Sequence, residues 1–78
     1  MYAWFWNENT YAHEYAFEGY TAFVAMEGET WAYDIFLGPR WVSHDCGYLT
    51  PETAMVNAGN AIWNDYSGSV AILDFCGA

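Results

Sequence analysis

Two strand-like segments joined by a short acidic turn constrain this chain more than any other feature. The segments are Tyr20–Met26 and Glu29–Leu37, and both are rich in aromatic and apolar residues. Gly28 lies between them and supplies the positive φ that a tight hairpin turn needs. The pattern therefore predicts a β-hairpin within an antiparallel sheet.

Further strands are expected on both sides of this hairpin. Tyr2–Trp6 is a strand candidate before it, and turn-prone residues follow that segment. After the hairpin, a Gly38-Pro39 turn precedes a short strand at Arg40–His44. The apolar run Ser69–Cys76 is expected to form a final buried strand.

The segment at residues 11–18 admits two interpretations. Asn9 or Thr10 would cap a helix that Gly19 would end. Strict alternation of ring-bearing residues instead favours a half-buried strand, and we prefer it because aromatic residues at a period of two suit a pleated surface. The residues on one face of that strand would be Tyr11, His13, Tyr15 and Phe17.

The clearest helix signal begins at Thr50, a residue type that caps helix N-termini. Pro51 suits the first helical position, and Glu52 lies in the first turn, where the helix dipole favours a carboxylate. The apolar pattern runs to about residue 65. We therefore predict a single α+β domain over residues 1–78, with one antiparallel sheet of four to five strands and one long helix, about residues 51–65, packed on one face.

The charge balance is unusual because basic residues are missing. The chain has ten acidic residues but a single basic one, Arg40, and a formal net charge of −9 at pH 7. A folded protein of this charge is repelled by nucleic-acid backbones and by anionic membranes. The expected partner is a basic nucleic-acid-binding protein or complex, with no direct binding of nucleic acid or membrane. The expected location is a cytoplasm, such as that of an infected bacterium.

Aromatic side chains make up 22% of the chain. They carry more ring area than a core of this size can hold, so some rings must lie on the surface. Exposed aromatic residues are typical of contact surfaces. This favours a binding protein, and it also allows a homodimer.

Motifs for catalysis or metal binding are missing from the sequence. It has no CxxC and no HExxH, and the nearest group of metal-ligand types is His44-Asp45-Cys46. Cys46 and His44 would share a face of a strand, but nothing supplies an evident oxyanion hole for a thiol nucleophile. We therefore predict no enzyme, no metal site and no cofactor. Reduced thiols are favoured over a disulfide between Cys46 and Cys76.

Carboxylates and rings in the strand region are the candidate contact residues. Carboxylates along a sheet can imitate a row of phosphates. Rings between them can add buried contact area, and the candidates are Tyr20, Trp31, Tyr33 and Trp41. Trp31 and Tyr33 are expected to be the anchors. The predicted partner-binding residues are Glu14, Glu18, Glu27, Glu29, Asp34, Tyr20, Trp31 and Tyr33.

The predicted helix carries residues at the spacing T-x-E-x-A-x-x-N-A-x-x-A-I, namely Thr50, Glu52, Ala54, Asn57, Ala58, Ala61 and Ile62. With the hairpin and strand before it, this segment resembles the β-β-β-α core of HicB-type antitoxins. The resemblance implies a domain that neutralises a basic toxin or acts as an adaptor.

The whole chain is similar in kind to small acidic phage-encoded inhibitors of host defence, of the anti-CRISPR and anti-restriction type. That likeness implies a non-enzymatic inhibitor that competes with nucleic acid. A self-associating structural module is a separate alternative.

Overall fold

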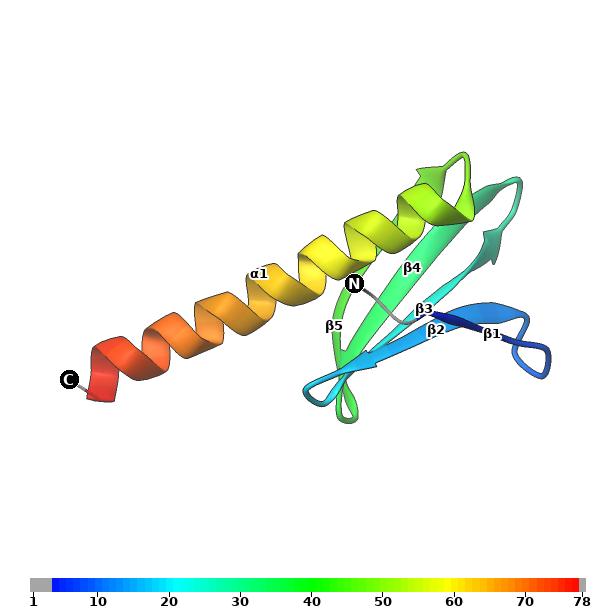
Figure 1. The fold of residues 1–78 in the computed structure, drawn as a ribbon. Helices are drawn as coiled ribbons and strands as arrows, with labels where there is room; N and C mark the ends of the chain where they lie inside the picture. The colour runs from blue at the N-terminus through cyan, green and yellow to red at the C-terminus, as the bar shows by residue number, and fades with distance from the viewer. Residues whose placement is uncertain (1–3, 78) are drawn as a thin grey trace.

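The computed structural model describes the backbone of residues 4–77 and the side chains of residues 4–68. Within this part of the chain, a five-stranded antiparallel sheet is followed by a long helix packed on one of its faces (Figure 1). This arrangement confirms the predicted α+β class. The elements in chain order are β1 (Phe5–Asn7), β2 (Ala12–Phe17), β3 (Tyr20–Glu27), β4 (Thr30–Leu37), β5 (Arg40–Tyr48) and α1 (Pro51–Gly77). The five strands lie in the sheet in this same order.

Tight loops join the central strands and set their register. Glu27 pairs with Thr30 across a two-residue loop, and Gly28 has a φ of 67° at its first position. Hairpin loops that begin with a positive-φ glycine match the twist of the flanking strands. The predicted hairpin is therefore confirmed. The ambiguous segment forms β2, which confirms the strand interpretation.

The helix begins as predicted, and its first hydrogen bond identifies the cap. The backbone N–H of Thr53 donates to Oγ1 of Thr50 over 3.2 Å, as expected for an N-cap residue. The helix does not end near Asp65, however, and the predicted final strand at Ser69–Cys76 is wrong, because α1 continues to Gly77. A short apolar run suits a strand or a helix equally well, so its pattern alone does not decide between them.

The length of α1 determines how it lies on the sheet. Its 27 residues span about 40 Å at 1.5 Å per residue. An eight-residue strand such as β4 spans only about 27 Å. The first half of the helix consequently covers the sheet, and the second half extends beyond it (Figure 1). Among the described residues, no helix is long and apolar enough to cross a membrane.

The core lies between the first half of α1 and the middle strands. Ala54, Ala58 and Ile62 follow one another at four-residue intervals on the helix, and all three are buried. They pack in one cluster with Val24 and Ile35 from the sheet. The two alanines allow the helix backbone to approach the sheet closely, because their side chains are small.

A hydrogen bond at the edge of this core joins the sheet to the helix. The buried Tyr20 on β3 donates its hydroxyl to Oδ2 of Asp65 on α1 over 2.5 Å. Arg40 lies 4.0 Å from the same carboxylate oxygen. Burial, and then the bond to Asp65, raises the pKa of Tyr20 to about 12. The folded protein therefore favours the neutral phenol.

This shift predicts a specific loss of stability at alkaline pH. The contribution of Tyr20 is fully present below its ordinary pKa of 10 and is lost as the pH rises through about 12. We expect the free energy of unfolding to fall more steeply over this interval in the wild type than in Tyr20→Phe. Urea unfolding at a series of pH values measures both slopes. Equal slopes would contradict the assignment, since all other tyrosines are common to the two proteins.

Candidate functional site

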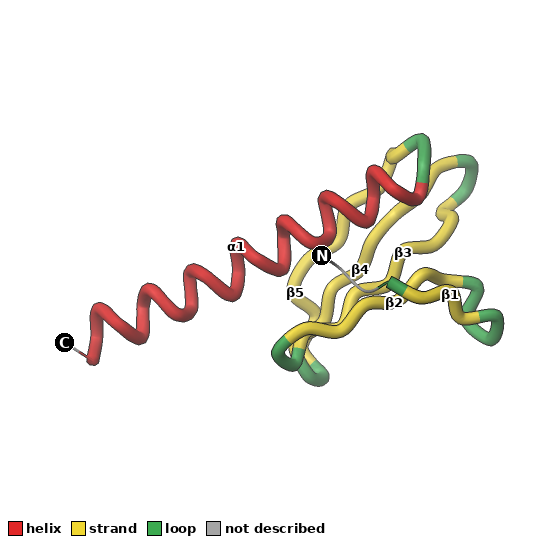
Figure 2. Tube along the Cα trace, viewed as in Figure 1, coloured by secondary structure: helices red, strands yellow, loops and turns green. Residues whose placement is uncertain are grey.

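The face of the sheet that α1 does not cover is the candidate site, and we call it the open face. Among the described residues no other element covers it (Figure 2). Phe23 lies on this face because its neighbours Ala22 and Val24 point into the core, and side chains alternate along a strand. Residues that pair directly across neighbouring strands point to the same side of the sheet. The pairing partners of Phe23 therefore also lie on the open face.

One row on the open face alternates rings and carboxylates across the sheet. Pairing joins Phe5 to Glu14, Glu14 to Phe23, and Phe23 to Asp34. Asp34 in turn pairs with His44 on β5. Strands are about 4.8 Å apart, so the two carboxylates of this row are separated by about 10 Å at the backbone. A partner would therefore meet negative charges with an apolar ring between them.

A second group of rings lies beside this row. Phe36 packs edge-to-face against Phe23, with ring centroids 6.0 Å apart. Trp41 pairs with Phe36 on the neighbouring strand and is exposed. Its indole Nε1–H donates to Oδ1 of Asp34 over 3.3 Å. These contacts hold the two phenylalanine rings against each other and fix the Asp34 carboxylate beside Trp41.

Negative charge predominates on the open face. Arg40, the single basic residue of the chain, lies next to Asp65 on the helix side. His44 is a titratable residue on the open face, and its Nδ1 lies 2.9 Å from Oδ1 of Asp34. The hydrogen bond to Asp34 raises the pKa of His44 above its ordinary value, with further contributions from the charges of Asp34 and Glu27. The carboxylates thus dominate the potential of this face.

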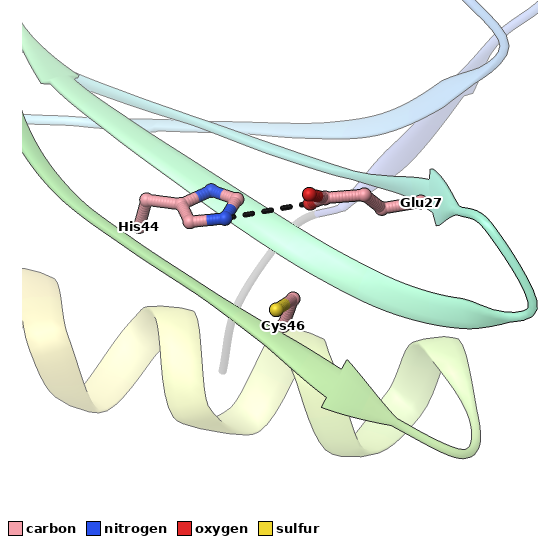
Figure 3. Close-up of side chains that lie close together, drawn as sticks. All are labelled: Glu27, His44 and Cys46. Atoms are coloured by element: carbon pink, nitrogen blue, oxygen red, sulfur yellow. Dashed lines mark ion pairs between the residues drawn. The ribbon is translucent and has the colours of Figure 1, made fainter.

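A cluster of three potential ligand groups lies at one end of the open face. Glu27 ends β3, whereas His44 and Cys46 lie two residues apart on β5. The carboxylate oxygen, imidazole nitrogen and sulfur atoms of these residues are all within 4.8 Å of one another. His44 Nε2 lies 3.4 Å from Glu27 Oε2, and Figure 3 shows the ring and the carboxylate facing each other. Cys46 has a free, exposed thiol, whereas Cys76 lies outside the described side chains.

An irregularity in β5 next to this cluster determines where Tyr48 lies. Trp31 pairs with Tyr48 and Tyr33 with Asp45, so β5 has one more residue than β4 over this interval. Such a bulge reverses the alternation of side chains beyond it. Cys46 lies two residues after His44 and shares the open face with it by ordinary alternation, whereas Tyr48, beyond the bulge, turns to the other side and stacks on Tyr33. β5 runs to Tyr48, beyond His44, where the sequence predicted its end.

The structure separates the predicted contact residues into three groups. Glu14, Glu27 and Asp34 lie on the open face. Glu18 and Glu29 are exposed in turns at opposite ends of the central strands. The three predicted rings lie on the face that α1 covers, so their selection as exposed contact groups is corrected: Tyr20 is 3% exposed, Tyr33 is 7% exposed and Trp31 is partly buried against the core.

Among the described residues, the open face presents the rings of Phe5, Phe23, Phe36 and Trp41. Trp41 was considered as a contact ring from the sequence, whereas the three phenylalanines were not. Phe23 and Phe36 each lie next to a core position of their strand. Because side chains alternate along a strand, both rings point to the face opposite the core. His44 and Cys46 were recognised as neighbours, but Glu27 joins them only through the strand pairing.

Comparisons of this chain with protein-family models, with curated proteins and with solved structures found no match.

Proposed function

We propose that this protein is a non-enzymatic inhibitor that binds a basic nucleic-acid-handling protein through the open face and competes with nucleic acid. A CRISPR effector is the most concrete example of such a partner. The observation that carries the proposal is the row Phe5–Glu14–Phe23–Asp34, which alternates rings and carboxylates while Arg40 is kept on the opposite side of the sheet.

The two kinds of side chain in this row contribute differently to binding. Glu14 and Asp34 steer the protein toward a basic groove and occupy positions that phosphates otherwise take. Phe23, Phe36 and Trp41 then bury apolar area against the walls of that groove and slow dissociation. Rigid support from the sheet reduces the entropy lost on binding, because the rings are already in contact with their neighbours.

A charge-matched pair of double variants tests this proposal. Glu14→Gln with Asp34→Asn removes two charges from the open face. Glu8→Gln with Glu52→Gln removes two exposed charges from elsewhere and leaves the formal net charge of the two variants equal. Both double variants are compared by their ability to displace a labelled nucleic acid from a purified CRISPR effector. The displacement is measured at several salt concentrations with a metal chelator present.

We expect the open-face variant to weaken displacement roughly tenfold or more, because a close interfacial charge pair is worth about 1.5 kcal/mol or more. The control should change it by less than about threefold, since charges at a rim act mainly on association. Equal effects of the two variants would contradict a specific role for the open face, as would displacement that does not weaken as salt rises.

A basic toxin is the alternative partner that the antitoxin-like resemblance implies. A basic toxin would contact the same carboxylates, so the same two double variants test its binding. Affinity capture from a bacterial lysate, with mass spectrometry of the retained proteins, distinguishes the two kinds of partner. Size-exclusion chromatography of the isolated protein distinguishes both from a self-associating module.

A further inference from the structure

The cluster of Glu27, His44 and Cys46 is built from two strands that are not neighbours. β4 lies between β3 and β5 in the sheet, so the backbones of the two strands are about 10 Å apart. The residue of β4 that lies between them on the open face is Ala32, which is buried. Because this alanine is small, the longer side chains from either side can converge above it. Glu27 in particular needs its full length to reach His44.

A hydrogen bond outside the cluster determines which nitrogen of His44 faces it. An ionised carboxylate only accepts hydrogen bonds, so the contact between Asp34 Oδ1 and His44 Nδ1 places a proton on Nδ1. The other nitrogen, Nε2, is thereby directed at Glu27 and presents its lone pair in the neutral ring. A carboxylate that orients a histidine in this way is the usual outer partner of a metal-binding imidazole.

The resulting arrangement brings electron-pair donors together. Nε2 of a neutral His44 and Oε2 of Glu27 are both acceptors, yet they lie only 3.4 Å apart, with the sulfur of Cys46 nearby. A metal ion placed between these groups would be attracted by all three.

We propose that Glu27, His44 and Cys46 bind a zinc ion, with Asp34 as the residue that orients His44. The observed separation of 3.4 Å between Nε2 and Oε2 is close to the edge of about 3.3 Å that a tetrahedral zinc site has when both bonds are about 2.0–2.1 Å long. The exposed thiol then closes onto the ion by a side-chain rotation. Zinc binding releases the proton of the Cys46 thiol and any proton on Nε2 to solvent.

The ligand types select zinc over the common hard cations. Thiolate and imidazole are ligands that zinc prefers, whereas magnesium and calcium take oxygen ligands. Three protein ligands leave a fourth position for water or for a ligand from a partner. This zinc site does not depend on the proposed inhibitor function, because it requires the isolated protein alone.

Metal titration of the full-length chain tests the site. The reduced protein is freed of metal with a chelator and then titrated with zinc in competition with a chromophoric indicator. We expect one zinc ion per chain. Cobalt in place of zinc should give the visible bands of a tetrahedral site and a thiolate-to-cobalt charge-transfer absorption in the near ultraviolet.

Single variants identify the ligands, and a neighbouring acid provides the matched control. Cys46→Ser, His44→Asn and Glu27→Gln should each weaken zinc binding by about tenfold or more, and Asp34→Asn by about ten- to a hundredfold. Glu29→Gln removes the same charge two residues from Glu27 and should change the affinity by less than about twofold, because exposed charges beyond the ligands act weakly. Cys76→Ser should leave the cobalt spectrum unchanged.

Three outcomes would overturn the proposal. The first is no stoichiometric zinc binding, and the second is a charge-transfer band that persists in Cys46→Ser. The third is a loss of affinity in Glu29→Gln as large as that in Glu27→Gln, which would indicate diffuse attraction of cations to an acidic surface. Far-ultraviolet circular dichroism of each variant checks that the exposed substitutions leave the fold intact.

Discussion

Ile35→Ala is expected to lower the free energy of unfolding by about 3 kcal/mol, because deleting a buried branched side chain removes transfer energy and leaves a cavity. Ile35 is 0% exposed and lies on the core face of β4. A domain of 78 residues has a total stability of about 4–12 kcal/mol. The substitution therefore removes a large share of the stability.

Urea unfolding followed by circular dichroism measures this loss. Leu49→Ala provides the control, since Leu49 is also a large aliphatic residue but is 87% exposed. Its effect should stay within about 0.5 kcal/mol, as for most surface substitutions. Similar losses in the two variants would contradict the core described above.

Ala58→Leu is expected to have the second largest effect, a loss of about 2–3 kcal/mol from overpacking. Ala58 is 0% exposed and lies where α1 contacts the sheet. A larger side chain at this position must separate the helix from the sheet, because the core is closely packed on both sides. The same urea experiment reports the change.

Val56→Leu is the control for that substitution. Val56 lies on the outer side of the same helix and is exposed, so an added methylene should change stability by less than about 0.5 kcal/mol. If Ala58→Leu were as well tolerated as this control, the helix would not be seated on the sheet at Ala58.

Local signals in the sequence accounted for the parts of the fold that depend on neighbouring residues. The hairpin between β3 and β4 followed from Gly28, and the start of α1 followed from Thr50 and Pro51. Each signal acts over a few residues, because a positive φ and a capped N–H are local properties. The end of α1 lacked such a signal, since the run after Gly68 suits either a strand or a helix.

The choice of which sheet face is buried was not a local property. Along β3, the core positions Tyr20, Ala22 and Val24 alternate with Thr21 and Phe23, and both sets contain apolar residues. Alternation therefore divides the strand into two faces without indicating which of them α1 covers. For this reason Tyr20 and Tyr33 were expected on the surface, whereas Phe23 and Phe36 are among the rings found on the open face.

By itself, the sequence determined the α+β class, the hairpin and the negative charge that motivates a basic partner, because composition and turn chemistry are properties of the chain. Tertiary structure alone decided which rings face solvent and brought Glu27 to His44 and Cys46. The physical reason is that the pairing of β3 with β4 and of β4 with β5 joins residues far apart in the chain. Their contact depends on hydrogen bonding between strands, which no short stretch of sequence specifies.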